Sequence, residues 1–385
     1  MRSKPLSGTA INNSNTFKEI KAQPRLWRET YDIIENKKVE LTTFLNKVLG
    51  FKNIHIILTG AGTSAYIGDV LHKSFQRKSK RVTEAVATTD LISHPEDYFS
   101  PDKPTLLVSF ARSGDSPESV ATVELADKYC ETLFHLIITC NAEGKLAKNA
   151  TKKNAYVLLM PKEANDKALA MTGSFTTMLL AGVLVSDLSN LNKNKAYVDR
   201  LLAYGEKIIS SYQKRINVIA ALNFKRVVFL GSGALKGIAR ESQLKVQELT
   251  DGQVVCKYDS FLGLRHGPKA VIDNDTLVVY LFSSNEFVNQ YEYDLVRSIN
   301  DQKEKLYEIG IGEALIKKDK INLDLSIEVS TKNHIPEEYF AVCAVLPGQL
   351  LGLHKSINLG LNPDSPSVNN SINRVVKGVN IYKHQ

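Results

Sequence analysis

The feature that most constrains the fold is a strand, a glycine turn and a helix that occur twice in the chain. Residues 54–58 are β-branched or apolar almost throughout, and residues 226–230 have the same character. Each stretch runs into a glycine turn, at 60–62 and at 231–233, and then into a segment of helical composition. A strand, a glycine turn and a helix N-terminus together form a natural anion site.

The spacing after each turn is also repeated. Gly60 lies 45 positions before the next strand, which begins at Thr105, and Gly231 lies 45 positions before the strand that begins at Thr276. Self-similarity at a fixed spacing is the signature of a repeated structural unit. We therefore expect an internal duplication of one α/β unit.

The strands of the first half alternate with helical segments. Further apolar strands are predicted at 105–110, 134–139 and 156–160, and a long apolar helix ends near Leu188. Strands that are apolar along their whole length favour a parallel sheet covered on both faces. The predicted fold class is α/β, with two tandem doubly wound parallel-sheet units after an N-terminal helical segment. Ligands of such folds bind at the carboxyl ends of the strands.

The chain is predicted to contain two sheet units and three smaller parts. The N-terminal helical segment is expected to break at Pro24, and Trp27 is expected to pack rather than bind a ligand. The predicted parts are the helical segment 1–48, the first unit 49–190, a connecting helix 191–222, the second unit 223–360 and a C-terminal tail 361–385 over the active site.

Composition excludes several classes of protein. The net charge of +8 is spread over 385 residues, without an arginine-rich tract or zinc-finger spacing, so we expect an anionic small substrate and not nucleic acid. Four distant cysteines favour a reducing cytoplasm over a disulfide framework. The longest apolar run, 175–185, is too short to cross a membrane, and we expect no metal and no cofactor.

Two loops at neighbouring strand ends are rich in hydroxyl groups. Ser64 follows the first glycine turn, and Ser113 and Ser116 follow the strand 105–110. Two such loops predict a phosphate site in the first unit; the alternative is that the two later serines only cap a helix. The predicted phosphate-binding residues are Gly62, Thr63, Ser64, Arg112, Ser113, Gly114 and Ser116.

A charged helix follows the second glycine turn. Residues 237–249 have helical composition, with Gly252 as the predicted stop. Glu241, Lys245 and Glu248 share one side of this helix and lie within its apolar arc. The alternative is an ion pair on a wet surface, but the flanking leucines favour a partly buried, paired set of charges that serves acid/base chemistry.

These motifs resemble those of the double SIS (sugar isomerase) family. The resemblance rests on residues 60–64, 112–116, 241–248 and 266–268, and it extends from about Asn53 onward. The chain is similar to the isomerase half of glucosamine-6-phosphate synthase and closer to the galactosamine-6-phosphate deaminase/isomerase group, also called tagatose-6-phosphate ketose/aldose isomerase. The resemblance implies flavodoxin-like units and a homodimer or larger homo-oligomer.

The resemblance also implies roles for single residues. Glu248 would move the proton between C1 and C2, with Lys245 and Glu241 as charged companions. His266 would open the sugar ring, acting in trans from a neighbouring subunit as in the family, and Lys377 would reach the open-chain carbonyl. From the residues alone, His266 reads as a buried histidine at a Gly-Pro turn and Lys377 as an ordinary tail lysine.

The implied reaction converts D-galactosamine 6-phosphate to D-tagatose 6-phosphate and ammonia. Ala111 and Met171 stand where the synthase has serines, so the sugar epimer stays open. The alternatives are a ketose/aldose phosphate isomerase without deamination and a non-catalytic module that senses sugar phosphates. No glutaminase part is evident, which favours release of ammonia over its incorporation.

Overall fold

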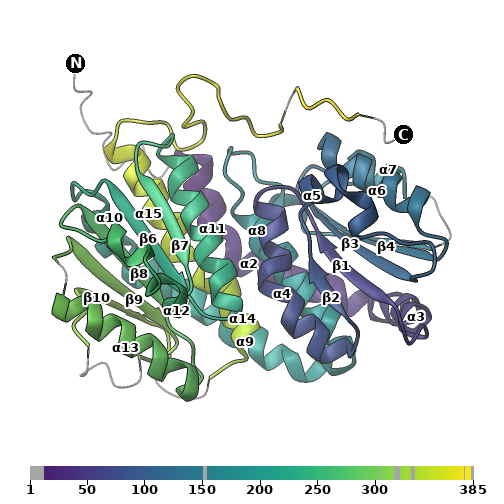
Figure 1. The fold of residues 1–385 in the computed structure, drawn as a ribbon, viewed down its shortest axis with the longest axis horizontal. Coiled ribbons are helices and arrows are strands. Elements are labelled where there is room, and N and C mark those ends of the chain that lie inside the picture. The colour runs from purple at the N-terminus through teal and green to yellow at the C-terminus, as the bar shows by residue number, and fades with distance from the viewer. Residues whose placement is uncertain are drawn as a thin grey trace. The chain divides into compact units, whose positions relative to one another are not determined.

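The computed structural model describes residues 13–150, 154–302, 304–315, 321–330, 334–376 and 378–382. The chain divides into two compact units, each built on one five-stranded sheet (Figure 1). The first unit comprises residues 25–166 and 171–198 and the described residues from 372 onward. The second comprises the described residues up to Pro24, 167–170 and 199–371.

The first unit contains a parallel sheet with the strand order β2-β1-β3-β4-β5. Every residue of the three central strands is buried, which confirms the prediction of a sheet covered on both faces. Its elements are β1 (His55–Thr59), α4 (Thr63–Ser79), β2 (Thr83–Ala85), α5 (Thr88–Ser93), β3 (Thr105–Ala111), α6 (Pro117–Tyr129), β4 (Leu133–Thr139), α7 (Lys145–Lys148), β5 (Ala155–Leu159) and α8 (Gly173–Ser186).

The second unit contains a parallel sheet with the order β10-β9-β8-β6-β7. Counted from its own first strand, this is the same order as in the first unit, 2-1-3-4-5, which is the flavodoxin-like arrangement. Its elements are β6 (Arg226–Gly231), α11 (Ala234–Leu249), β7 (Val255–Asp259), α12 (Phe261–Leu264), β8 (Thr276–Leu281), α13 (Glu286–Gln302), β9 (Tyr307–Gly312), β10 (Leu325–Glu328), α14 (Glu337–Ala344) and α15 (Leu346–Asn358).

The duplication extends to the strand register. Ile57 of β1 pairs with Leu107 of β3, and Val228 of β6 pairs with Val278 of β8. Both members of the second pair lie 171 positions after their counterparts, as Gly231 does after Gly60. The predicted fold class of two tandem α/β units is therefore confirmed.

Helix α2 (Asn15–Asn36) contradicts one prediction, because it continues through Pro24. A proline inside a helix leaves the carbonyl four residues earlier without its usual amide partner. Here that carbonyl belongs to Ile20, and it accepts a hydrogen bond from the Gln23 side chain instead (3.3 Å). The helix ends at Asn36, and α3 (Lys38–Leu49) follows.

Trp27 lies in the core, as predicted. Its side chain is fully buried, and its indole N–H donates to Thr176 Oγ1 of α8 (2.9 Å). The predicted connecting helix consists of α9 (Leu191–Lys207), a π-helical turn (Ile208–Tyr212) and α10 (Gln213–Ala220). Helices α14 and α15 together form a 22-residue stretch apolar enough to cross a membrane, but its most apolar window is wholly buried, as in a core helix.

Candidate active site

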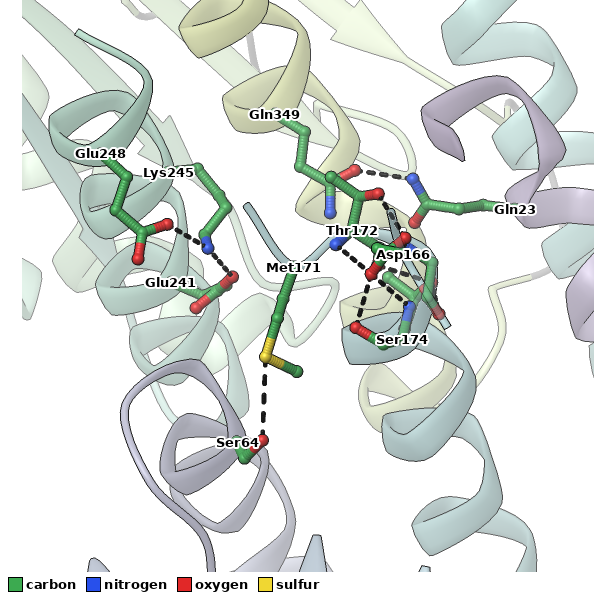
Figure 2. Close-up of polar contacts among 12 residues, drawn as sticks. Gln23, Ser64, Asp166, Met171, Thr172, Ser174, Glu241, Lys245, Glu248 and Gln349 are labelled. Atoms are coloured by element: carbon green, nitrogen blue, oxygen red, sulfur yellow. Dashed lines mark hydrogen bonds and ion pairs between the residues drawn. The ribbon is translucent and has the colours of Figure 1, made fainter. Parts of the chain in front are cut away.

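The first glycine turn places Ser64 at the beginning of α4. A Cβ on Gly60 would lie 2.6 Å from the Cβ of Ser64, so a side chain at position 60 would collide with the helix. Gly62 has φ of 54°, in the left-handed region that favours glycine, and it precedes the first residue of α4. The tight turn holds Ser64 buried at 4% exposure, with its hydroxyl directed to the Met171 sulfur (3.8 Å; Figure 2).

The loop between β3 and α6 is held in shape by the loop after β4. The Asn141 amide donates to the Ser113 carbonyl oxygen (2.9 Å), and the Lys145 backbone N–H donates to Asp115 Oδ1 (3.0 Å). A Cβ on Gly144 would lie 2.3 Å from the same Ser113 oxygen, so this approach requires glycine. The loop that carries Ser113 is therefore fixed by its neighbours before any ligand binds.

Neither serine of this loop caps α6 through its side chain. Ser116 occupies the N-cap position before Pro117, but its hydroxyl makes no capping bond and donates to Ser119 Oγ (2.6 Å). Ser113 Oγ accepts from the Asp115 amide (3.3 Å). The alternative that both serines only cap the helix is therefore wrong.

These groups line one small pocket of the first unit, with a volume of ≈ 100 Å³. We call it the serine pocket. Its lining combines hydroxyl groups with Arg112, which is 7% exposed. This combination suits an anion such as a phosphoryl group. The pocket is lined by Ala61, Ser64, Phe110, Ala111, Arg112, Ser113, Gly114, Ser116, Ser119, Met171, Arg374, Val375 and Val376.

Two predicted members do not line the serine pocket. Gly62 shapes the turn, and Thr63 is buried at the first position of α4. Among the lining residues with hydroxyl or charged side chains, two were not predicted: Ser119, which lies one helical turn after Ser116, and Arg374 of the C-terminal tail. The first could have been found from its spacing of three residues, which places both hydroxyls on one side of α6.

Arg374 attaches the tail to the wall of the serine pocket. Its guanidinium donates to Asn165 Oδ1 (2.7 Å) and to the Asp166 carbonyl oxygen (2.8 Å). Its own carbonyl accepts a hydrogen bond from Arg112. The segment Arg374–Val376 therefore belongs to the pocket of the first unit, although it follows the second unit in the sequence.

Glu241, Lys245 and Glu248 form a row of charges on α11, which we call the charged row. Lys245 Nζ lies 2.6 Å from Glu248 Oε2 and 3.4 Å from Glu241 Oε1 (Figure 2). The side chains of Glu241 and Lys245 are fully buried, and that of Glu248 is 23% exposed. The alternative of an ion pair on a wet surface is wrong.

The charged row is fixed by the close packing of α15 on α11. A Cβ on Gly348 would lie 2.6 Å from the Cβ of Ser242, and a Cβ on Gly352 would lie 3.0 Å from the Lys245 carbonyl oxygen. Burial of charged groups costs several kcal/mol per ion unless they are paired. Lys245 offsets this cost by bridging two carboxylates, and the Glu248 end of the row is the part that solvent reaches.

The end of α11 differs from the prediction at one position. The helix ends at Leu249. Two residues after it have a left-handed φ: Gly252, which was predicted as the stop, and Asp251 (φ 50°), which was not. The amides of Asp251 and Gly252 donate to the carbonyls of Glu248 (3.1 Å) and Gln247 (3.0 Å). This pair of bonds is a Schellman motif, and Gly252 is its second residue.

The remaining two candidates are His266 and Lys377. His266 is exposed, and its backbone N–H donates to the Gly263 carbonyl (3.1 Å), so the reading as a buried histidine is wrong. Lys377 lies outside the described residues. The geometry of the described chain thus supplies an anion pocket in the first unit and a buried acid–base row in the second.

Comparison with known proteins identifies the family of the chain. The model of the SIS domain matches residues 51–186. A protein of Escherichia coli O157:H7 named D-galactosamine-6-phosphate deaminase AgaS is 40% identical over 379 residues, which cover 98% of this chain and 97% of that protein.

Solved structures agree over nearly the whole length. A crystal structure from Clostridium novyi NT has a TM-score of 0.93 and 42% identity, covering 96% of this chain and 95% of its own. The crystal structure of the tagatose-6-phosphate ketose/aldose isomerase from Escherichia coli has a TM-score of 0.88 and 37% identity, covering 99% of each chain. The chain therefore belongs to the AgaS family of SIS-domain proteins.

Proposed function

We propose that this chain is an amino-sugar phosphate deaminase that converts D-galactosamine 6-phosphate to D-tagatose 6-phosphate and ammonia. The observation that carries the proposal is the 40% identity, over 98% of the chain, to a protein named for that deamination. The serine pocket and the charged row supply the two kinds of group that the reaction needs, an anion site and a positioned acid–base.

In the proposed reaction, the substrate phosphate is bound by the hydroxyls of Ser64, Ser113 and Ser116 and by Arg112. His266, from the same or a neighbouring subunit, transfers a proton to the ring oxygen as the sugar opens. A dimer or larger oligomer is part of this proposal. The exposed position of His266 is compatible with a role outside its own unit.

Glu248 then takes the proton from C2 of the open-chain amino sugar and returns it to C1. Removal of this proton places negative charge on the C1 oxygen, which is balanced by the ammonium group of Lys245, with Lys377 near the carbonyl. Protonation of that oxygen by solvent gives the enolamine, and the nitrogen releases a proton as C1 is protonated. The resulting imine at C2 is hydrolysed by water, which gives the ketose 6-phosphate and ammonium. A positioned acid–base of this kind contributes roughly 10²–10⁴-fold to a rate.

The site of action that we propose is the cytoplasm. All four cysteines are unpaired, three of them buried, which suits a reducing compartment.

An ammonium-release assay tests the proposal. Galactosamine, glucosamine and mannosamine 6-phosphates are supplied in parallel, and we expect the fastest release of ammonium from the galactosamine ester. Binding of all three esters without turnover of any would contradict the proposal and favour a sensing module.

A second candidate function is ketose/aldose isomerisation without deamination. It is favoured by the name of the Escherichia coli protein whose structure matches this chain over 99% of its length. Interconversion of tagatose 6-phosphate with its aldose, without ammonium from any amino sugar, would establish this function instead.

A further inference from the structure

The glycine turn of the first unit is reproduced in the second with the same backbone. Gly62 precedes α4 with φ 54° and ψ −127°, and Gly233 precedes α11 with φ 54° and ψ −126°. The two residues are 171 positions apart, which is the offset of the whole duplication. The backbone geometry of a turn that can bind an anion is therefore present twice in the chain.

The two turns differ in what surrounds them. Ser64 of the first turn corresponds to Leu235, and Arg112, one of the two arginines that line the serine pocket, corresponds to Ser283. Beside the second turn lies a carboxylate of the same unit. Glu337 Oε1 is 3.2 Å from the position that a Cβ on Gly233 would take, and Glu337 Oε2 accepts a hydrogen bond from the Ser283 hydroxyl.

Ser283 stands between this carboxylate and a second one. Ser283 is 3% exposed. Its backbone N–H donates a hydrogen bond to Glu292 Oε2 (3.1 Å), and its hydroxyl donates one to Glu337. The Asn289 side chain also donates to Glu292 Oε2 (2.9 Å), and the Ser232 hydroxyl of the turn bonds to Glu292 as well. The donors at this strand end are thus directed to carboxylates of the protein itself.

We propose that Glu337 occupies the anion site of the second unit and acts as a positioning residue for α11. A carboxylate at a helix N-terminus is stabilised by the backbone amides and the positive end of the dipole. Helix α11 carries the charged row, and Glu248 lies near the opposite end of the helix, so the fixed carboxylate beside Gly233 acts on Glu248 through the position of the whole helix and not by contact. The second turn then has no place for another phosphate.

The expected effect of Glu337 on turnover rests on the proposed deaminase function. Its expected effect on anion binding does not depend on that function and can be measured separately. The first experiment uses the E337A variant and isothermal titration with inorganic phosphate and with formate. We expect E337A to gain one saturable anion site per chain beyond those of the wild-type protein. An E337A variant that binds no more phosphate or formate than the wild type would overturn the occupancy of the second turn.

The second experiment uses E337Q, which keeps the shape of the side chain and removes its charge. We expect kcat to fall about tenfold with KM unchanged, because the substrate phosphate is bound by the other unit. E286Q is the matched control, since Glu286 lies exposed in the first turn of α13 in the same unit. A kcat of E337Q equal to that of E286Q would overturn the positioning role. This comparison remains valid even if E337A does not fold.

Chemical rescue separates a missing charge from a packing defect. Formate is small enough to replace the lost carboxylate, so it is expected to restore most of the lost kcat of E337A while leaving E286Q unchanged. A loss of kcat that no concentration of formate or phosphate reverses would show that Glu337 acts through packing alone and would overturn the proposal. If wild-type activity is absent altogether, the proposed function fails, and the titrations still decide on the anion site.

Discussion

Glu248 is the member of the charged row that solvent reaches, and its carboxylate is held 2.6 Å from the Lys245 ammonium. A general acid–base needs this combination of a fixed position and access to substrate. Glu241, by contrast, is fully buried on the far side of the lysine. These positions support the proposal that Glu248 transfers the proton and that Glu241 supports Lys245.

The E248Q substitution tests this assignment. It keeps the size of the side chain and removes its ability to take a proton, so we expect kcat to fall roughly 10²–10⁴-fold while binding of the sugar phosphate is retained. Steady-state kinetics and calorimetric titration measure the two effects, with E286Q as the control. Near-normal turnover by E248Q would refute the proton-transfer role.

Glu292 makes the stability of the protein depend on pH near neutrality. Burial, opposed by its hydrogen bonds and reinforced by the charge of Glu337, raises the pKa of Glu292 from 4.5 to about 7. The folded protein therefore holds this proton more tightly than the unfolded chain does, so the stabilisation is complete below about pH 4.5 and is lost as the pH rises through about 7. This group alone would lower the free energy of unfolding by about 3 kcal/mol over that range.

The E292Q variant should lack this contribution. Denaturant unfolding of both proteins between pH 5 and about 8 measures it, and we expect the stability of E292Q relative to the wild type to increase with pH. A difference that stays constant over the range would contradict the raised pKa.

At the scale of single elements, α8 depends on one buried carboxylate. Asp166 accepts hydrogen bonds from the amides of Thr172 (2.9 Å), Gly173 (3.0 Å) and Ser174 (3.0 Å). Two hydroxyls of the same segment also donate to it, as Figure 2 shows. The carboxylate thus satisfies the first amides of a helix that has no cap bond from its own N-cap residue.

Removal of this carboxylate should destabilise the protein. We expect D166A to lower the free energy of unfolding by roughly 3 kcal/mol, because several buried donors lose their acceptor together. D90A is a suitable control, since Asp90 is exposed in the first turn of α5, and it should change stability by less than about 0.5 kcal/mol. Urea unfolding measures the change in the free energy of unfolding of each variant. Equal changes in D166A and D90A would show that the hydrogen bonds to Asp166 do not stabilise the protein.

Local sequence patterns predicted the elements better than their ends. The buried strands, both glycine turns and the charged row follow from apolar runs and from spacing, which are local properties. The effect of Pro24 was predicted wrongly because the side chain of Gln23 donates to the carbonyl that a proline inside a helix leaves without its amide partner. Arg374 and Glu337 could not be predicted, because their partners lie far away in the sequence and no periodicity links them.

For the whole molecule, the main consequence of the duplication is that two similar units hold different chemistry. The first keeps cationic and hydroxyl groups at its glycine turn, and the second has a carboxylate there. One copy of the fold is therefore suited to bind a phosphate, while the other presents the charged row. The repeat was visible in the sequence, but this division of roles became clear only with the side-chain contacts.

The C-terminal tail should matter for substrate binding more than for folding. A variant that ends at Asn373 loses three residues of the serine pocket and the carbonyl partner of Arg112, but it loses no strand. We expect its affinity for sugar phosphate to fall at least about tenfold, as measured by calorimetric titration, with an unchanged circular dichroism spectrum. A variant that ends at Tyr382 is the control, and equal affinities of the two variants would contradict the prediction.

The placement of Arg374–Val376 has a consequence for biosynthesis. The first unit is translated early, but the last part of its ligand pocket is translated only after the whole second sheet. A nascent chain can thus form its first sheet long before it can hold a substrate, and a gene cut between the two sheets would encode an early fragment with an unfinished pocket.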